Sequence, residues 1–135
     1  MPLVNDDTAY PVTAHGQTGA RLLGVSPSGA LVKMRDASLQ TVTANYTLQA
    51  SDDWQTILVN SASDVTITVP NSLPAGFWCG FARLGAGNVT FAAASGGTLQ
   101  PTTVTKLAAQ YSQGSVFIAT NSGSAPLILL GGDLA

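Results

Sequence analysis

Short stretches of alternating hydrophobic and polar residues recur along the chain from residue 46 onward. The alternation is strict over residues 65–70, where Val65, Ile67 and Val69 are separated by threonines. Successive side chains of a β-strand point to opposite faces, so this pattern predicts a half-buried strand. Similar reasoning predicts further short strands over residues 46–49, 56–60, 77–84, 89–94, 98–100, 102–107, 115–120 and 126–130.

Turn-forming residues separate these segments at intervals of about 8 to 12 residues, which is typical of a sandwich or a small barrel. No helical pattern is long enough to connect parallel strands by a crossover. One helical turn is expected over residues 50–55, with Ser51 as its cap. We recognise no repeat with a period of 20 to 50 residues. The predicted fold class is all-β: a compact β-sandwich or jelly-roll-like small barrel of about eight short strands, with an extended N-terminal arm and hairpin.

The first 45 residues differ from the rest in pattern. Residues 1–20 contain several prolines and glycines and show no period, so we interpret them as an arm that orders on docking or as a frayed terminus. Residues 21–25 and 30–35 flank a Ser-Pro-Ser-Gly turn, which predicts a β-hairpin. The expected organisation is an arm over residues 1–20, a hairpin and linker over 21–45, and a β-sandwich domain over 46–135.

Composition narrows the classes of function. Of the 135 residues, 45% are hydrophobic and only 9% are charged, against about 25% charged in ordinary soluble domains. A net charge of −2 does not favour nucleic-acid binding. No apolar run reaches 18 residues, and the start lacks a signal-peptide pattern, so we expect neither membrane insertion nor export. So few charges protect a monomer poorly against association, which suggests burial against copies of the chain or a partner.

The reactive residue types are few and poorly placed for chemistry. His15, the single histidine, lies beside Gly16 in the loosest part of the chain, where a solvated loop residue is expected. Cys79 alternates with Phe77 and Phe81, which is typical of a small core residue. We therefore predict no catalytic residue and no enzymatic activity.

Paired carboxylates and a glycine-rich turn are the remaining candidates for chemistry. Calcium binding through Asp52, Asp53 and Asp64, or through Asp6 and Asp7, lacks the alternating spacing of a dedicated calcium loop. Asp52 and Asp53 are better explained as helix-start residues. No helix follows Gly85-Ala86-Gly87, so these glycines are interpreted as turn residues and not as a phosphate cradle. Neither a metal site nor a cofactor is predicted.

Aromatic residues offer the one plausible binding feature. Trp78 alternates with Gly80 and Ala82, so the face of its strand is otherwise small. An aromatic side chain above small residues either packs against a neighbouring subunit or lies open to a ligand such as a sugar. Trp54 and Trp78 are therefore candidates for a subunit interface or a glycan site, and Tyr10, Tyr46 and Tyr111 could extend a sugar-stacking platform.

The order of several short motifs resembles a β-domain of tailed-bacteriophage virion proteins, which include head-fibre proteins, capsid decoration proteins and tail-fibre segments. The resemblance covers residues 46–134. It is carried by residues 46–52, 57–70, 84–91, 97–99, 109–112 and 130–134. The final strand departs from the pattern, because Leu127–Leu130 replace the usual aromatic residue near its end.

This resemblance implies a non-enzymatic structural protein of the virion, often a trimer. The short chain favours a capsid decoration (cement) or head-fibre protein that is made in the host cytoplasm, associates as a homotrimer and binds the major capsid protein on the capsid surface. The alternative is a tail-fibre or baseplate domain that binds a receptor or a host surface glycan. The N-terminal arm would dock on the capsid lattice, and its candidate docking residues are Leu3, Val4, Tyr10 and Val12.

Overall fold

The computed structural model describes residues 23–25, 31–33 and 39–135, and the chain divides into two units, Met1–Ser38 and Leu39–Ala135. In the first unit, β2 (Leu23–Val25) and β3 (Leu31–Lys33) form an antiparallel pair. The candidate docking residues Leu3, Val4, Tyr10 and Val12, together with His15, lie outside the described residues.

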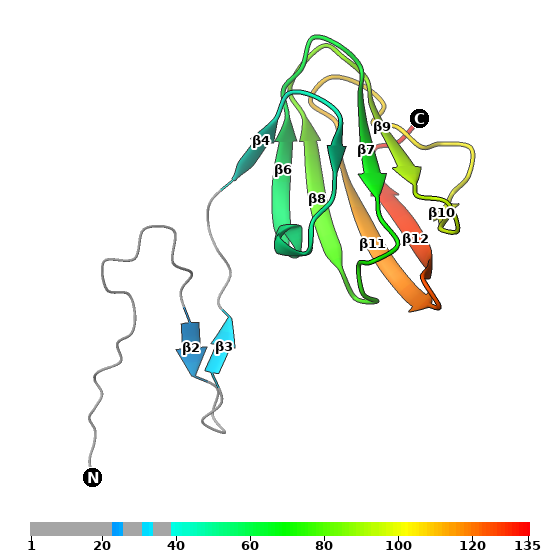
Figure 1. The fold of residues 1–135 in the computed structure, drawn as a ribbon. Coiled ribbons are helices and arrows are strands. Elements are labelled where there is room, and N and C mark those ends of the chain that lie inside the picture. The colour runs from blue at the N-terminus through cyan, green and yellow to red at the C-terminus, as the bar shows by residue number, and fades with distance from the viewer. Residues whose placement is uncertain (1–22, 26–30, 34–38) are drawn as a thin grey trace. The chain divides into compact units, whose positions relative to one another are not determined.

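The second unit is an all-β body built from two sheets (Figure 1). This arrangement confirms the predicted fold class and is compatible with a compact β-sandwich. The larger sheet has the order β10 (Thr98–Gln100), β12 (Ala125–Gly132), β11 (Gln113–Ser122), β8 (Trp78–Arg83), β6 (Gln55–Val59) and β4 (Gln40–Val42). The smaller sheet has the order β5 (Tyr46–Thr47), β7 (Val65–Val69) and β9 (Val89–Ala93). Because β4 belongs to the larger sheet, the body begins before residue 46.

Successive strands from β4 to β9 alternate between the two sheets. In the larger sheet β4 pairs parallel with β6, and β6 with β8. In the smaller sheet β5 pairs parallel with β7, and β7 with β9. The backbone therefore forms three stacked coils, each with one strand in either sheet, as in a parallel β-helix.

The second and third coils repeat with a period that the sequence analysis missed. Ile57 lies opposite Phe81 and Val65 opposite Val89, so equivalent positions are 24 residues apart. The expectation that no such period exists was wrong. The repeat is hidden because only backbone pairing and inward-facing apolar character are shared along most of its length.

Close stacking of the coils is visible at the turns between β6 and β7 and between β8 and β9. Gly85 and Gly87 lie directly against the backbone of Ser61 and Ser63, their equivalents one coil earlier, and a Cβ atom on either glycine would overlap a serine carbonyl. The amide of Gly87 donates to the carbonyl of Ser61 at 2.9 Å. These glycines are turn residues, as predicted, and the close approach explains why glycine is required there.

An antiparallel hairpin completes the larger sheet. β11 pairs with β8 on one side and with β12 on the other, and β10 adds parallel to β12. The prediction of a strand over residues 102–107 is wrong. Within that segment only Lys106 and Leu107 form β-bridges, to Thr90 and Leu134 respectively, so it covers the edge of β9 without a continuous ladder.

The core lies between the two sheets and consists of the inward-facing residues of both. Strand β7 buries alternate residues as its sequence predicts. On β8 the predicted inward face is confirmed, since Cys79, Phe81 and Arg83 are buried. Other fully buried residues are Leu48, Ile57, Ile67, Phe77, Leu107, Ile118 and Ile128.

Arg83 is a buried cation that holds the third coil together. Its guanidinium donates to the carbonyls of Ala86 at 2.6 Å, Gly85 at 3.4 Å and Leu107 at 3.4 Å. Charge-assisted hydrogen bonds of this kind are stronger than neutral ones. The side chain therefore ties the turn after β8 to the segment that covers β9.

Candidate functional site

The most distinctive surface of the body is the side of the larger sheet that faces away from the smaller one, which we call the outer face. Alternation along the strands and their register place uncharged side chains there. On the four central strands these residues are Thr56, Leu58, Trp78, Gly80, Ala82, Gln113, Ser115, Phe117, Leu127, Leu129 and Gly131.

Three of the five large hydrophobic residues that the described part of the chain leaves exposed lie on or beside this face. Trp54, Phe117 and Leu129 expose 59%, 39% and 37% of their surface. Since a large aromatic side chain presents about 150–250 Å², the three together expose on the order of 300 Å². Patches of this size on monomers are often functional.

Trp54 and Trp78, the two tryptophans singled out in the sequence, lie together at one end of β8. Their ring centroids are 5.6 Å apart and their planes are inclined by 32°. Trp78 is half-buried on the sheet, whereas Trp54 is exposed. Tilted aromatic pairs of this kind contribute about 0.5–1.5 kcal/mol beyond the area they bury.

The turn before β6 positions Trp54. A short 3-10 helix, η3 (Ala50–Asp52), begins after Gln49, whose backbone N–H donates to Asp52 Oδ2 at 2.7 Å. The cap is therefore Gln49 and not Ser51, because the capping-box carboxylate comes from Asp52, which also accepts a hydrogen bond from the Tyr46 hydroxyl at 3.0 Å. The turn is thereby anchored to the first coil.

Trp54 has an unusual backbone conformation. Its φ of 61° lies in the left-handed region, which bulky residues rarely adopt. Its N–H donates to the carbonyl of Trp78 at 2.7 Å, and the N–H of Trp78 donates to Asp53 Oδ1 at 3.1 Å. A left-handed residue of this type costs about 1–3 kcal/mol, and such strain concentrates at functional positions.

Trp78 lies along the sheet over a glycine. A Cβ atom on Gly80 would come within 2.9 Å of the Trp78 ring and 3.3 Å of Thr56 Oγ1. Glycine at this position therefore lets the indole lie close to the backbone beside a hydroxyl group. This arrangement explains the spacing that made Trp78 a candidate in the sequence.

A row of large apolar side chains crosses three neighbouring strands from Trp78. Phe117 of β11 is paired with Trp78 of β8 and with Leu129 of β12. Two residues along, Ser115 is paired with Gly80 and with Gly131, so a row of small residues runs beside the large one. A shallow step in side-chain size results between the two rows.

The strand positions of the outer face carry no ionisable side chain, and the nearest carboxylate is that of Asp53, which accepts from the backbone N–H of Trp78 at 3.1 Å. Arg83 and Asp52 are buried on the inner side. Burial raises the pKa of the Tyr46 phenol, and the Asp52 carboxylate beside it adds to that effect. Burial also raises the pKa of the Cys79 thiol to about 12, so the thiolate is strongly disfavoured. Cys79 has the inert core environment that its sequence position predicts.

The tyrosines that could have extended a sugar platform do not join the tryptophan pair. Tyr46 packs against the core with its hydroxyl on Asp52. Tyr111 is 72% exposed and donates its N–H to the carbonyl of Arg83, at the opposite end of β8 from Trp78. Tyr10 lies outside the described residues.

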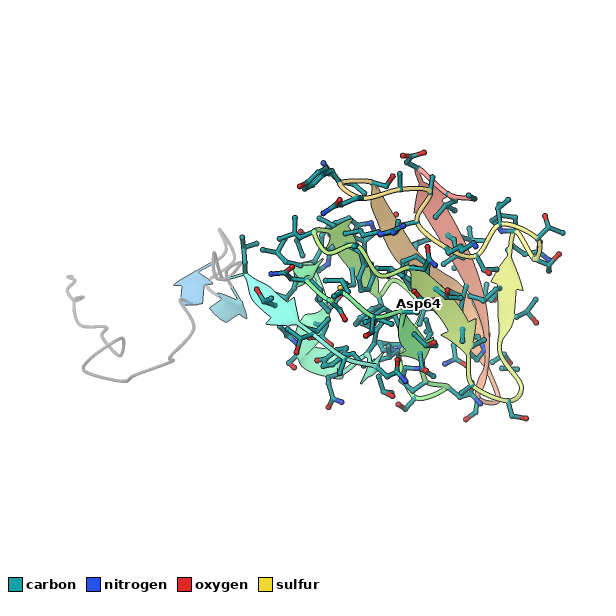
Figure 2. All side chains as sticks on the ribbon, turned by 90° about the horizontal axis from the view of Figure 1, so that it is seen from above. Asp64 is labelled. Carbon is teal, nitrogen blue, oxygen red and sulfur yellow. The ribbon has the colours of Figure 1, made fainter. Side chains whose placement is uncertain are left out.

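The candidate metal ligands remain separate as well. Asp53 accepts from the backbone of Trp78, whereas Asp64 lies on the turn after β6 and accepts from Asn88. Figure 2 looks down on the end of the body that carries this turn and labels Asp64. Within residues 39–135 and the two short strands before them, no group of three His, Cys, Asp or Glu side chains is placed to hold a metal ion.

Sequence reasoning did not identify Phe117 and Leu129 as site residues. The signal was present in β11, since Val116 and Ile118 are apolar core residues and the residue between them must point outward. For Leu129 the signal was weaker, because residues 127–130 are apolar throughout.

No family model, curated protein or solved structure matches this chain. In the described part of the chain, no helix has the length and apolar character needed to cross a membrane.

Proposed function

We propose that this chain is a structural protein of a tailed-bacteriophage virion, a capsid decoration (cement) or head-fibre protein that binds the major capsid lattice on the capsid surface. The motif resemblance over residues 46–134 suggests this class. The observation that carries the proposal is the outer face, because an uncharged sheet surface with exposed Trp54, Phe117 and Leu129 favours contact with another protein surface.

The mechanism is attachment through many weak contacts. A repeating shell offers the same binding position many times, and each copy that bridges two capsid subunits resists their separation. Each copy therefore needs only a modest interface. The body made of stacked coils supplies a rigid support, since its turns are held by Arg83 and by the close approach of Gly85 and Gly87 to the coil before.

Self-association is part of the proposal. The resemblance implies a homotrimer, whereas a single uncharged outer face on each copy favours contact between pairs of copies. The chain is proposed to act without catalysis, in line with the buried thiol of Cys79 and the scattered carboxylates.

Purified virions test the proposal directly. Mass spectrometry of the particles is expected to detect the chain in many copies, and electron cryomicroscopy is expected to show its two-sheet body at symmetry-related positions on the head. Particles that lack the chain, or density confined to the tail, would refute a role in capsid decoration. Rebinding of the purified chain to heads that lack it provides the complementary measurement.

A second candidate function is receptor or glycan binding by a tail-fibre or baseplate domain. The specific observation in its favour is the exposed, left-handed Trp54 stacked beside Trp78, which resembles a sugar-stacking platform. A glycan array with the wild-type chain and Trp54→Gly separates the candidates. A sugar signal that disappears in the variant would favour the receptor role, and absence of any signal would favour decoration.

A further inference from the structure

The outer face combines three properties that bear on what could cover it. It has no charged residue at any strand position, it carries a row of large apolar side chains, and a row of small residues lies directly beside that row. The large row is Trp78, Phe117 and Leu129, and the small row is Gly80, Ser115 and Gly131.

The row of small residues leaves open space above the sheet only on β11 and β12. On β8 the Trp78 ring lies over Gly80 and fills that position. On the other two strands, a Cβ atom on Gly131 would meet only Ser115 Oγ, at 3.2 Å. The ridge formed by Phe117 and Leu129 therefore runs beside a shallow hollow formed by Ser115 and Gly131, about 7 Å away for two residues of a strand.

A ridge beside a hollow of the same length is self-complementary about a two-fold axis that lies between them. The axis lies in the plane between the two facing sheets, parallel to the rows and midway between the ridge and the hollow. Rotation by 180° about this axis turns the outer face of one copy toward that of the other and places each ridge over the other copy's hollow. This is the isologous contact typical of two-fold dimers. We propose that two copies of this chain pack their outer faces together, with Phe117 and Leu129 of each copy over Ser115 and Gly131 of the other.

The absence of charged side chains favours a second copy as the occupant, and the area of the face sets how strongly two copies would associate. A charged partner surface would lose hydration against this face without gaining an opposite charge, whereas pairing of the face with itself buries no charge and dehydrates only neutral groups such as those of Thr56, Gln113 and Ser115. The four central strands, about 4.8 Å apart and roughly 20 Å long, have a footprint on the order of 400 Å². Stable interfaces bury about 800 Å² of accessible surface per partner, so a concentration-dependent pair is expected and not an obligate one.

This inference deepens the proposed function, because it names the surface through which copies associate, and it can fail separately. If the chain is monomeric in solution yet present on heads, the pairing is wrong and the decoration role stands. If it pairs in solution but is absent from virions, the pairing stands and the decoration role is wrong.

The first experiment measures the mass of the full chain by sedimentation over a series of concentrations. The average mass is expected to rise from the 13.7 kDa of one chain toward twice that value. Phe117→Asp and Ser115→Lys are each expected to keep the protein monomeric, because each buries an unpaired charge in both halves of the contact. Tyr111→Ser, which removes an exposed aromatic residue at the opposite end of β8, is expected to leave association unchanged.

The second experiment mixes the two charged variants. In a mixed pair, the new carboxylate at position 117 of one copy faces the new ammonium at position 115 of the other, and the remaining contact is wild-type. Dimers are therefore expected in the mixture but in neither variant alone. Circular dichroism melting of each variant verifies that the body is folded.

Several results would overturn the inference. These are a mass of one chain at all concentrations up to about 1 mM, where even a complex with a millimolar Kd is populated, an oligomer that both charged variants leave intact, and a mixture that stays monomeric. A trimer would also refute it, because a contact in which each outer face covers the other joins only two copies. Loss of the dimer on adding a neutral oligosaccharide would identify a sugar as the natural occupant instead.

Discussion

Asp64 of the second coil accepts hydrogen bonds from Asn88, the residue that occupies the same position in the third coil. The backbone N–H of Asn88 donates to Asp64 Oδ1 at 2.9 Å, and its side-chain amide donates to both carboxylate oxygens at 3.2 and 3.3 Å. Asn45 of the first coil makes a related contact, since its Oδ1 accepts from the N–H of Thr66 at 2.9 Å. A polar side chain at each turn thus satisfies a backbone donor of the next coil.

The Asp64 contact predicts a dependence of stability on pH. The hydrogen bonds from Asn88 lower the pKa of Asp64 below its ordinary value of 3.8. The stabilisation is therefore fully present above pH 3.8 and is lost as the pH falls through the lowered value in the folded state. The free energy of unfolding of Asp64→Asn, measured by denaturant titration across this range, is expected to fall less steeply on acidification than that of the wild type. Parallel curves would contradict the assignment.

Close stacking of the turns predicts that one added methyl group lowers the stability of the body strongly. In Gly87→Ala the new Cβ atom would overlap the Ser63 carbonyl, so the coils must separate at a cost of about 2–3 kcal/mol in the free energy of unfolding. The control is Gly123→Ala, where a Cβ atom meets nothing within 4 Å and only its left-handed φ of 63° costs about 1 kcal/mol. Equal losses in the two variants would show that the coils are not in contact as described.

The left-handed conformation of Trp54 predicts an inverted order of stability. Within a helix or strand, a protein with glycine at a given position is usually less stable than one with alanine there, by about 0.5–1 kcal/mol. At position 54 glycine relieves the strain of a φ of 61°, whereas alanine keeps it. Trp54→Gly is therefore expected to unfold at a higher denaturant concentration than Trp54→Ala, with a difference of about 1 kcal/mol. The usual order, with alanine the more stable, would mean that Trp54 is not held in this conformation.

The buried guanidinium of Arg83 predicts a large loss of stability when a neutral side chain replaces it. Arg83→Met keeps most of the apolar stem but leaves the carbonyls of Gly85, Ala86 and Leu107 without their donor, at a cost of about 2–4 kcal/mol. The matched control is Lys106→Met, since the exposed Lys106 is expected to contribute less than about 0.5 kcal/mol. Thermal unfolding of both variants measures the difference, and similar melting temperatures would contradict the role of Arg83.

The buried thiol of Cys79 predicts slow chemical modification. Its pKa of about 12 keeps it as an unreactive thiol at neutral pH, and it has no exposed surface. A thiol-specific reagent is expected to label the native protein only as fast as the body opens, and the denatured protein at once. Because the pKa is raised, stability is also expected to decline as the pH rises above the ordinary thiol value of 9.0. Rapid labelling of the native chain would place Cys79 at the surface.

The sequence predicted single strands well because their information is local. The alternation of Val65, Ile67 and Val69 directly reports a buried face, and the same holds for Phe77, Cys79 and Phe81. Pairing was not predicted, because a turn such as residues 84–88 looks alike whether it closes a hairpin or crosses to the opposite sheet. The repeat was visible only as residues 61–66 against 85–90, where serine becomes glycine and aspartate becomes asparagine.

The candidate site was predicted only in part, because local patterns reveal single residues but not how distant strands pair. Trp78 was recognised because its neighbours Gly80 and Ala82 are small, and the structure places it on the outer face as that pattern suggests. The position of Trp54 depends on a left-handed residue, and the local sequence favours a helical turn there instead. The row that joins Trp78 to Phe117 and Leu129 depends on strands that lie far apart in the chain.

The antiparallel hairpin of β11 and β12 has a consequence for how the body could change in length. Because β11 occupies the edge of β8, the pile of coils ends there and cannot grow at that side. An additional 24-residue coil, inserted in the sequence between β7 and β8, would instead stack between the second and third coils and move the hairpin outward by one strand spacing. The hairpin would thus remain the end of the stack, and the length of the body would be set by the number of 24-residue units before it.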